Sequence, residues 1–226
     1  MYKDFLKNND FTKSNSKDKQ QEFLESLIDR TIQPKRILDA CCGGGALTYH
    51  IKQIYTKAHY ELVDYSENAI KSAKELNKGD TKINYRNSSL EDIEFNDNLF
   101  DVVFCWKTLS FIDEPEKMLK ELIRVAKQNA NIYLSFLYNF NHSVDIYSRV
   151  MDWTNPHPEC HYNTFCGMTL KKWLGNMGYK IVKFEPQKPI EQTYKALDTY
   201  TIESGNGLLQ IGGGQLLNWG VLIITK

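Results

Sequence analysis

The sequence lacks the features that would assign it to several classes of protein at once. Its 28 Lys and Arg residues balance 28 Asp and Glu residues, so the chain carries no net charge to attract nucleic acid. It has no run of about 20 apolar residues, the length that a membrane-spanning helix needs. Its N-terminal stretch, MYKDFLKNNDFTKSNSKDKQ, has no apolar segment typical of a signal peptide. We therefore expect a soluble, cytoplasmic protein whose partner is neither a nucleic acid nor a membrane.

Cysteine is also scarce, and the chain has an odd number of cysteines. There are five, and two of them, Cys41 and Cys42, are adjacent within a glycine-rich segment. This pattern argues against a disulfide framework and favours a reducing compartment. His157, Cys160, His161 and Cys166 lie close together in the sequence, but neighbouring side chains such as Cys160 and His161 would hardly converge on one zinc ion. We expect no metal site.

The sequence does contain short apolar runs that alternate with amphipathic helical patterns. The runs recur at residues 36–40, 60–64, 83–87, 101–106, 131–136, 180–184 and 221–225. Helical patterns cover residues 20–29, 46–54, 66–77, 115–127 and 170–177. This alternation predicts an α/β fold with a seven-stranded, mostly parallel sheet and helices on both faces. Because no helix pattern separates the last two strands, we expect them to form a terminal antiparallel hairpin.

The first two predicted strands enclose a candidate ligand site. The strand RILDA leads into the turn CCGGG and a helical stretch, and the next strand, YELVD, ends in Asp64. The glycines allow the backbone to lie against a ligand, and the helix N-terminus offers unpaired N–H groups. A carboxylate at the tip of the second strand can accept hydrogen bonds from ribose hydroxyls. The turn differs from a dinucleotide site, since Thr48 takes the place of the third glycine and Asp39 would repel a pyrophosphate. A ligand with positive charge suits it better.

Residues 37–48, ILDACCGGGALT, resemble motif I of the class I S-adenosylmethionine-dependent methyltransferases, with Cys41 where the first glycine of the motif usually stands. The resemblance continues through residues 60–75, 83–95 and 100–127, which are similar to the second motif, the adenine-binding segment, and the fourth strand with its helix. It covers about residues 30 to 136 and returns weakly at 169–184. It implies a Rossmann-like fold and S-adenosylmethionine as the cofactor.

The resemblance also implies which residues bind the cofactor. Asp64 would bind the ribose, and Ser89 would accept a hydrogen bond from the adenine amino group. All the candidates follow or end strands, and in open α/β sheets ligands bind at that edge. The predicted cofactor-binding residues are Asp39, Cys41, Gly43, Gly45, Asp64, Tyr65, Ser89, Leu90 and Cys105.

Residues 138–166 interrupt the alternation of strands and helices, and they are rich in aromatic, amide and histidine side chains. Such a lining suits a small polar organic acceptor, although an ordinary surface insertion has a similar composition. A general base is required only if the acceptor loses a proton, and His161 and His142 are the candidates. The candidate acceptor-binding residues are Trp106, Tyr138 and Tyr162.

We expect residues 1–226 to form a single domain. Residues 1–29 would be an N-terminal helix or lid, residues 30–136 the cofactor-binding core, and residues 137–226 the acceptor-binding insertion with the last strands. The predicted function is methyl transfer from S-adenosylmethionine to a small molecule, such as a hydroxyl or amine of a metabolite or of a surface-sugar precursor. A nicotinamide-dependent oxidoreductase and a non-catalytic S-adenosylmethionine-binding module remain alternatives. The sequence does not indicate the acceptor or the oligomeric state.

Overall fold

The computed structural model describes the backbone of part of the chain. The described residues are 17, 19–90, 93–138, 145–151, 159–161, 163–179, 183–186, 195–196, 201–204, 207–210 and 218–226. Side chains are described for residues 17, 21–90, 93–137, 145–148, 163–179 and 221–226.

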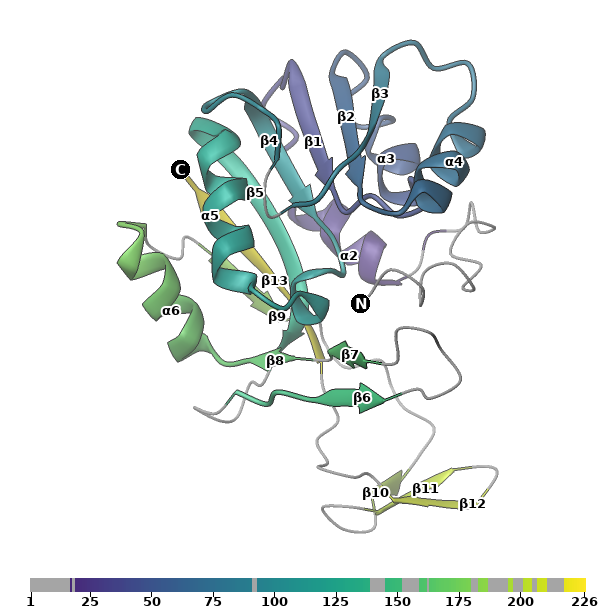
Figure 1. Cartoon of the computed structure of the whole chain (residues 1–226), viewed down its shortest axis with the longest axis vertical. Coiled ribbons are helices and arrows are strands. Elements are labelled where there is room, and N and C mark those ends of the chain that lie inside the picture. The colour runs from purple at the N-terminus through teal and green to yellow at the C-terminus, as the bar shows by residue number, and fades with distance from the viewer. Residues whose placement is uncertain are drawn as a thin grey trace.

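An eight-stranded sheet forms the centre of the described structure (Figure 1). Seven strands follow in the order β3-β2-β1-β4-β5-β13-β9, and β8 pairs with β5 off this path. The strands are β1 (Arg36–Ala40), β2 (His59–Asp64), β3 (Ile83–Asn87), β4 (Phe100–Cys105), β5 (Ala126–Tyr138), β8 (Thr164–Phe165), β9 (Lys183–Pro186) and β13 (Asn218–Thr225). Strands β1 to β5 pair in parallel. The predicted Rossmann-like α/β fold with a seven-stranded, mostly parallel path is confirmed.

The last strand lies inside the sheet, between β5 and β9. It is antiparallel to both, and its pairing with β5 runs from Asn218 opposite Tyr138 to Thr225 opposite Asn131. The predicted antiparallel pairing of the last two strands of the main sheet is therefore present between β9 and β13.

Five α-helices of the described part cover the two faces of this sheet. They are α2 (Lys19–Leu27), α3 (Ala46–Ile51), α4 (Glu67–Leu76), α5 (Pro115–Val125) and α6 (Gly167–Asn176), and a short 3₁₀ helix, η1 (Leu109–Phe111), follows β4. Local sequence sets their ends: Ser66 accepts a hydrogen bond from the Ala69 amide at 3.3 Å before α4, and Pro115 lies in the first turn of α5. None of the described helices is both long and apolar enough to span a lipid bilayer.

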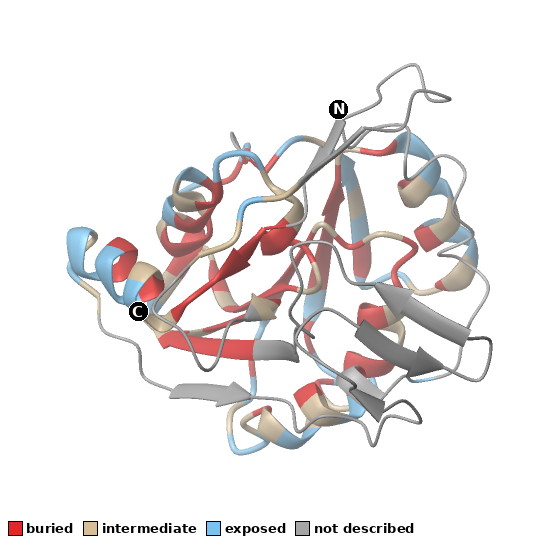
Figure 2. Ribbon diagram, turned by 90° about the horizontal axis from the view of Figure 1, so that it is seen from below, coloured by how far each residue is buried: buried red, intermediate tan, exposed pale blue. Residues whose placement is uncertain are grey.

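The sheet separates two apolar cores, which Figure 2 shows as buried segments along the central strands and the inner sides of the helices. Helices α5 and α6 pack on one face, around Leu134 and Phe136 of β5. Helices α2, α3 and α4 pack on the other face, where the rings of Phe104 and Tyr133 stack at 5.2 Å. Strands buried on both faces explain the continuous apolar runs in the sequence.

Five further short strands form two small sheets that the sequence did not predict. Strand β6 (Arg149–Met151) pairs antiparallel with β7 (Glu159–His161), and a three-stranded sheet contains β10 (Lys195–Ala196), β11 (Thr201–Ser204) and β12 (Gly207–Gln210). Strands of two to four residues are too short to show a period of two in the sequence. Strands β6 and β7 lie beyond the edge toward which β1, β4 and β5 point (Figure 1).

Candidate cofactor and acceptor site

The predicted glycine turn joins the carboxyl end of β1 to α3 through a tightly wound backbone. Three of its residues have positive φ angles: Cys41 (57°), Gly43 (52°) and Gly45 (77°). A β-carbon at Gly45 would lie 2.9 Å from Asn77 Nδ2 and 3.0 Å from the β-carbon of Ala73. Glycine is therefore required at position 45 by its backbone conformation and by the close approach of α4.

The surroundings of Gly43, unlike those of Gly45, are not crowded. A β-carbon built there would meet no atom within 4 Å, so this side of the turn is open. The Gly43 amide donates a hydrogen bond to Asp64 Oδ2 at 3.0 Å, and the Cys42 amide donates one to the Val63 carbonyl at 3.0 Å. These two bonds tie the turn to the tip of β2, as the prediction of a shared ligand site requires.

Asp64 is almost completely buried at that tip, with 3% of its surface exposed. Besides the Gly43 amide, its carboxylate accepts a hydrogen bond from the Ser66 amide at 2.9 Å. Burial raises the pKa of Asp64, and the backbone N–H groups of Ser66 and Gly43 act in the opposite direction.

Asp39 lies one strand away, on β1, and is also buried. Its Oδ2 accepts a hydrogen bond from the Thr48 hydroxyl at 2.6 Å. Burial raises the pKa of Asp39 to about 7 although the Thr48 hydroxyl lowers it, and the nearby charge of Asp64 adds to the rise.

The two acids have no cationic partner within the described part of the chain, where no ion pair includes Asp39 or Asp64. Two close carboxyl groups in a buried setting are costly to ionise together. A ligand that brings positive charge would relieve this cost, whereas a pyrophosphate would increase it.

The carboxyl end of β4 reaches the same edge. Cys105 is fully buried, and the Thr108 hydroxyl donates a hydrogen bond to the Trp106 carbonyl at 2.9 Å. Lys107, with a φ of 55°, is a second non-glycine residue in the left-handed region, and its amide donates to Ser135 Oγ at 2.6 Å. Strained backbone at two adjacent strand ends is typical of a functional site. The sequence did not reveal it, because neither strained position holds a glycine.

The predicted adenine-binding segment follows β3, and its residues differ in exposure. Leu90 is buried, Ser89 is exposed, and Tyr65, after β2, is half-buried. A pocket of about 280 Å³ adjoins this segment, and Ser88 rather than Ser89 lines it. Its lining residues are Val63, Arg86, Asn87, Ser88, Ile93, Glu94 and Phe95.

The predicted acceptor residues are only partly within the described structure. His142 and Tyr162 lie outside the described residues. The backbones of Tyr138 and His161 are described as the last residues of β5 and β7, without their side chains. Trp106, half-buried after β4, packs at the edge of the core that α2, α3 and α4 cover.

The backbone nevertheless places the acceptor segment near the end of β4. The Asn163 amide donates a hydrogen bond to the Ser110 carbonyl of η1 at 2.7 Å, and Ser110 Oγ accepts one from the Leu137 amide at 2.7 Å. In the sequence, Asn163 comes directly after His161, the candidate general base, and Tyr162, a candidate acceptor-binding residue. Within the described residues, no group of three or more His, Cys, Asp or Glu side chains is arranged to hold a metal ion.

Residues 38–134 match the family described as a methyltransferase domain. Over these residues the chain resembles a class I S-adenosylmethionine-dependent methyltransferase domain. S-adenosylmethionine is the cofactor of such domains, and the predicted family resemblance is confirmed. The match covers the glycine turn, both buried acids and the strands that carry them.

Curated relatives resemble this chain over part of their length. The mitochondrial ubiquinone biosynthesis O-methyltransferase of Saccharomyces cerevisiae is 30% identical over 123 residues, which are 53% of this chain and 38% of that protein. The ubiquinone biosynthesis O-methyltransferase of Hahella chejuensis is 31% identical over 116 residues, which are 50% and 48% of the two chains. The chain thus spans about half or less of the length of these relatives.

Solved structures share the fold of this protein over most of the chain. A structure described as a putative S-adenosylmethionine-dependent methyltransferase from Listeria monocytogenes covers 92% of this chain and 97% of its own, with a TM-score of 0.67 and 14% identity. A methyltransferase from Methanosarcina mazei covers 90% and 96%, with a TM-score of 0.61 and 15% identity.

Proposed function

We propose that the chain transfers the methyl group of S-adenosylmethionine to a small organic acceptor, and that residues 1–226 act as one domain. The observation that carries this proposal is the pair of buried acids, Asp39 and Asp64, beside a glycine turn that is open at Gly43. The cofactor brings a sulfonium and an ammonium group, which are the charges that these carboxyl groups lack.

The strand ends fit this cofactor. An ionised carboxylate offers about four acceptor positions, so Asp64 can accept the ribose hydroxyls while it keeps its bonds to Gly43 and Ser66. Asp39 would lie on the side of the methionine part, where a cation lowers its pKa again. The other predicted cofactor-binding residues complete the site: Cys41, Gly45, Tyr65, Ser89, Leu90 and Cys105.

The bound cofactor supplies a methyl group that is activated by the neighbouring sulfonium. The protein then contributes by aligning the acceptor with that methyl group and by excluding water. We assign the acceptor walls to Trp106, Tyr138 and Tyr162. For a hydroxyl acceptor, His161 would remove the proton as the carbon–oxygen bond forms, and His142 is the second candidate.

A small-molecule acceptor is supported by the names of the relatives, which include ubiquinone biosynthesis O-methyltransferases and a demethylmenaquinone methyltransferase. It is also supported by the hydrogen bond from the Asn163 amide to the Ser110 carbonyl, which brings residue 163 of the predicted acceptor segment, residues 138–166, beside the turn after β4. We therefore propose a hydroxyl on a small organic ring as the first acceptor class to screen.

The test is a thermal-shift comparison of S-adenosylhomocysteine, S-adenosylmethionine, NAD and NADP at saturating concentration. A ligand at a hundred times its dissociation constant adds about 2.7 kcal/mol to stability, which is worth several degrees for a chain of this size. We expect a shift with the two adenosyl ligands alone. A shift with the nicotinamide ligands alone would make the chain an oxidoreductase. Binding of the adenosyl ligands without methyl transfer to any acceptor in the screen would favour a non-catalytic module.

A further inference from the structure

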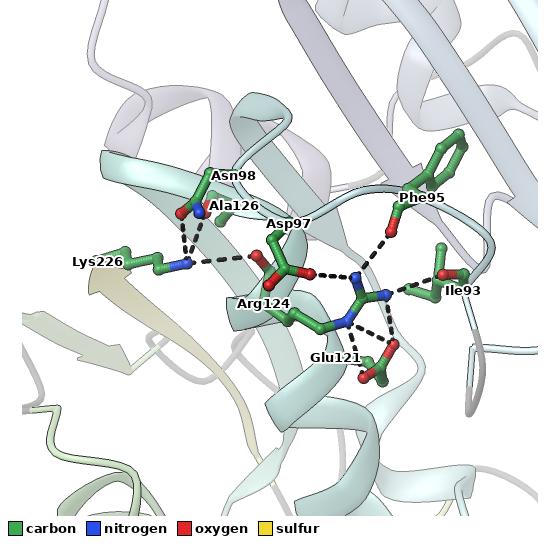
Figure 3. Close-up of polar contacts among 8 residues, drawn as sticks. All are labelled: Ile93, Phe95, Asp97, Asn98, Glu121, Arg124, Ala126 and Lys226. Carbon is green, nitrogen blue, oxygen red and sulfur yellow. Dashed lines mark hydrogen bonds and ion pairs between the residues drawn. The ribbon is translucent and has the colours of Figure 1, made fainter.

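The segment of residues 93–98 connects the predicted adenine-binding stretch to β4 without a helix or strand of its own. Within it the Phe95 amide donates a hydrogen bond to the Ile93 carbonyl at 2.7 Å, and further donors come from another element. Figure 3 shows that Arg124, on α5, supplies them. A side chain from a distant part of the sequence therefore helps to fix this segment, together with the hydrogen bond from the Asn98 amide to the Arg124 carbonyl at 3.0 Å.

The guanidinium of Arg124 donates hydrogen bonds to two carbonyls of the segment, those of Ile93 and Phe95. Its Nη1 donates to the Phe95 carbonyl at 2.8 Å, and its Nη2 donates to the Ile93 carbonyl at 2.9 Å. Asp97 and Glu121, each 2.7 Å away, fix the guanidinium from two further sides. A lysine has no rigid fork of donors and could not reproduce this arrangement.

The side chains of the same segment are also fixed. The ring of Phe95 lies between the guanidinium of Arg86, 4.6 Å from its centroid, and the ring of Phe100, 4.9 Å away at an edge-on angle. Ile93 is 2% exposed. With its backbone held by Arg124 and its side chains packed, the segment forms a rigid surface.

This surface is one wall of the pocket of about 280 Å³. Val63, Asn87 and Ser88, at the carboxyl ends of β2 and β3, also line it. Val63 directly precedes Asp64, the acid assigned to the ribose. The pocket therefore lies next to the strand end that carries Asp64, and its apolar lining residues are Val63, Ile93 and Phe95.

We propose that Arg124 is a positioning residue for the base end of the cofactor site. It does not touch the cofactor; it sets the place of the Ile93–Phe95 wall, and thereby the fit of the pocket to adenine. This inference rests on the proposed function, because it takes S-adenosylmethionine as the ligand.

The test uses the full chain and isothermal titration with two ligands: S-adenosylhomocysteine, and its analogue with hypoxanthine in place of adenine. The variant is Arg124→Lys, which keeps the charge and loses the fork. The matched control is Lys226→Ala. Lys226 binds the Arg124 carbonyl at 3.3 Å and the Ala126 carbonyl at 2.9 Å at the same helix end, and it binds the segment at Asn98 rather than at Ile93 or Phe95.

We expect Arg124→Lys to weaken S-adenosylhomocysteine binding about tenfold, as the loss of one charge-assisted hydrogen bond would, and to reduce the preference for adenine over hypoxanthine. Lys226→Ala should lower the melting temperature and leave both binding properties unchanged. If Arg124→Lys does not fold, Glu121→Gln loosens the same guanidinium and should shift the base preference in the same direction.

The assignment is overturned if the folded variants keep the wild-type base preference, or if Lys226→Ala reduces it as much as Arg124→Lys does. A wild-type chain that binds neither ligand would overturn the proposed function, and this assignment with it. The two failures are distinguishable, because the first leaves wild-type binding intact.

Discussion

Asp39 is a carboxylic acid in the interior of the protein, and its ionisation links the site to stability. Its pKa is about 7 in the folded chain, against an ordinary value of 3.8. Between these two values the folded state holds a proton that the unfolded state has lost. Raising the pH through this range therefore lowers the free energy of unfolding, and the loss is complete above the folded pKa.

Because Asn cannot ionise, we expect Asp39→Asn to abolish this pH-dependent decrease in the free energy of unfolding. The decrease amounts to up to a few kcal/mol, since one pKa unit corresponds to about 1.4 kcal/mol. Urea unfolding of both proteins at pH 5 and pH 8 would measure it. Asp80→Asn is the control, because hydrogen bonds from the Lys82 amide and the Lys52 side chain lower the pKa of Asp80 below its ordinary value of 3.8, so it should not change the difference between pH 5 and pH 8. Equal pH profiles for wild type and Asp39→Asn would contradict the assigned ionisation.

Asp64 has a different role, because its carboxylate connects two backbone amides before any ligand binds. We expect Asp64→Ala to weaken S-adenosylhomocysteine binding about ten- to a hundredfold, the range for a lost hydrogen bond to a charged group. Titration calorimetry gives the value. Glu67→Ala, a change at an exposed acid three residues away, should bind normally. Unchanged affinity in Asp64→Ala would place the ribose elsewhere.

The proposed general base is His161, and His142 is the second candidate. With a hydroxyl acceptor, His161→Ala should lower kcat on the order of a hundredfold or more, as the loss of a general base does, while S-adenosylhomocysteine affinity stays at the wild-type level. His142→Ala serves as the comparison. A larger loss in His142→Ala would exchange their roles, and full activity in both would indicate an acceptor that needs no base.

At the scale of elements, the carboxyl end of α5 is held by Lys226, which follows β13. Its Nζ contacts the carbonyls of Arg124 and Ala126 and the Asn98 side chain at 2.9 Å (Figure 3). A cation at this position satisfies open carbonyls and interacts favourably with the helix dipole.

Lys226→Ala should therefore lower the free energy of unfolding by about 1 kcal/mol. Lys117→Ala is a suitable control, because Lys117 is an exposed lysine in an i,i+3 ion pair at the other end of the same helix, and such pairs contribute little. Urea midpoints would compare the two. A smaller effect for Lys226→Ala than for Lys117→Ala would mean that the end of α5 does not need this cation.

The long elements were predictable from the sequence, because each has enough residues for its pattern to be visible. Strand β5 shows the limit. The apolar run starts at residue 131, but pairing begins at Ala126, with an irregularity in the register opposite Phe100 and Val102. Asn129 takes a φ of 66° there and donates to the Lys226 carbonyl at 2.7 Å. A polar stretch thus becomes strand through tertiary contacts.

The candidate site was predictable where one residue type is required, as at Gly45 and Asp64. It was not predictable where partners come from distant segments. Asp145 accepts hydrogen bonds from the Cys166 amide and the Thr169 hydroxyl at the start of α6, across a long stretch of sequence. Arg124 likewise appears in the sequence as an ordinary basic residue at the end of a helix.

At the scale of the whole molecule, the two cores depend on the same central strands. Leu222, in β13, is completely buried beneath α5 and α6, and it pairs with Leu134 on β5 and Phe184 on β9. Leu222→Ala should destabilise the protein by about 2–5 kcal/mol. Chemical denaturation measures this, and Leu76→Ala, at the partly exposed end of α4, should cost less. Similar losses would mean that β13 is not integral to the sheet.

The position of β13 also has a consequence for how the chain reaches this structure. One side of β5 remains an open strand edge until a partner from far along the chain arrives, and pairings between remote segments form slowly. During that time the row of free N–H and C=O groups on β5 can pair with another molecule. Refolding yield should therefore fall as protein concentration rises, with aggregation beginning at β5.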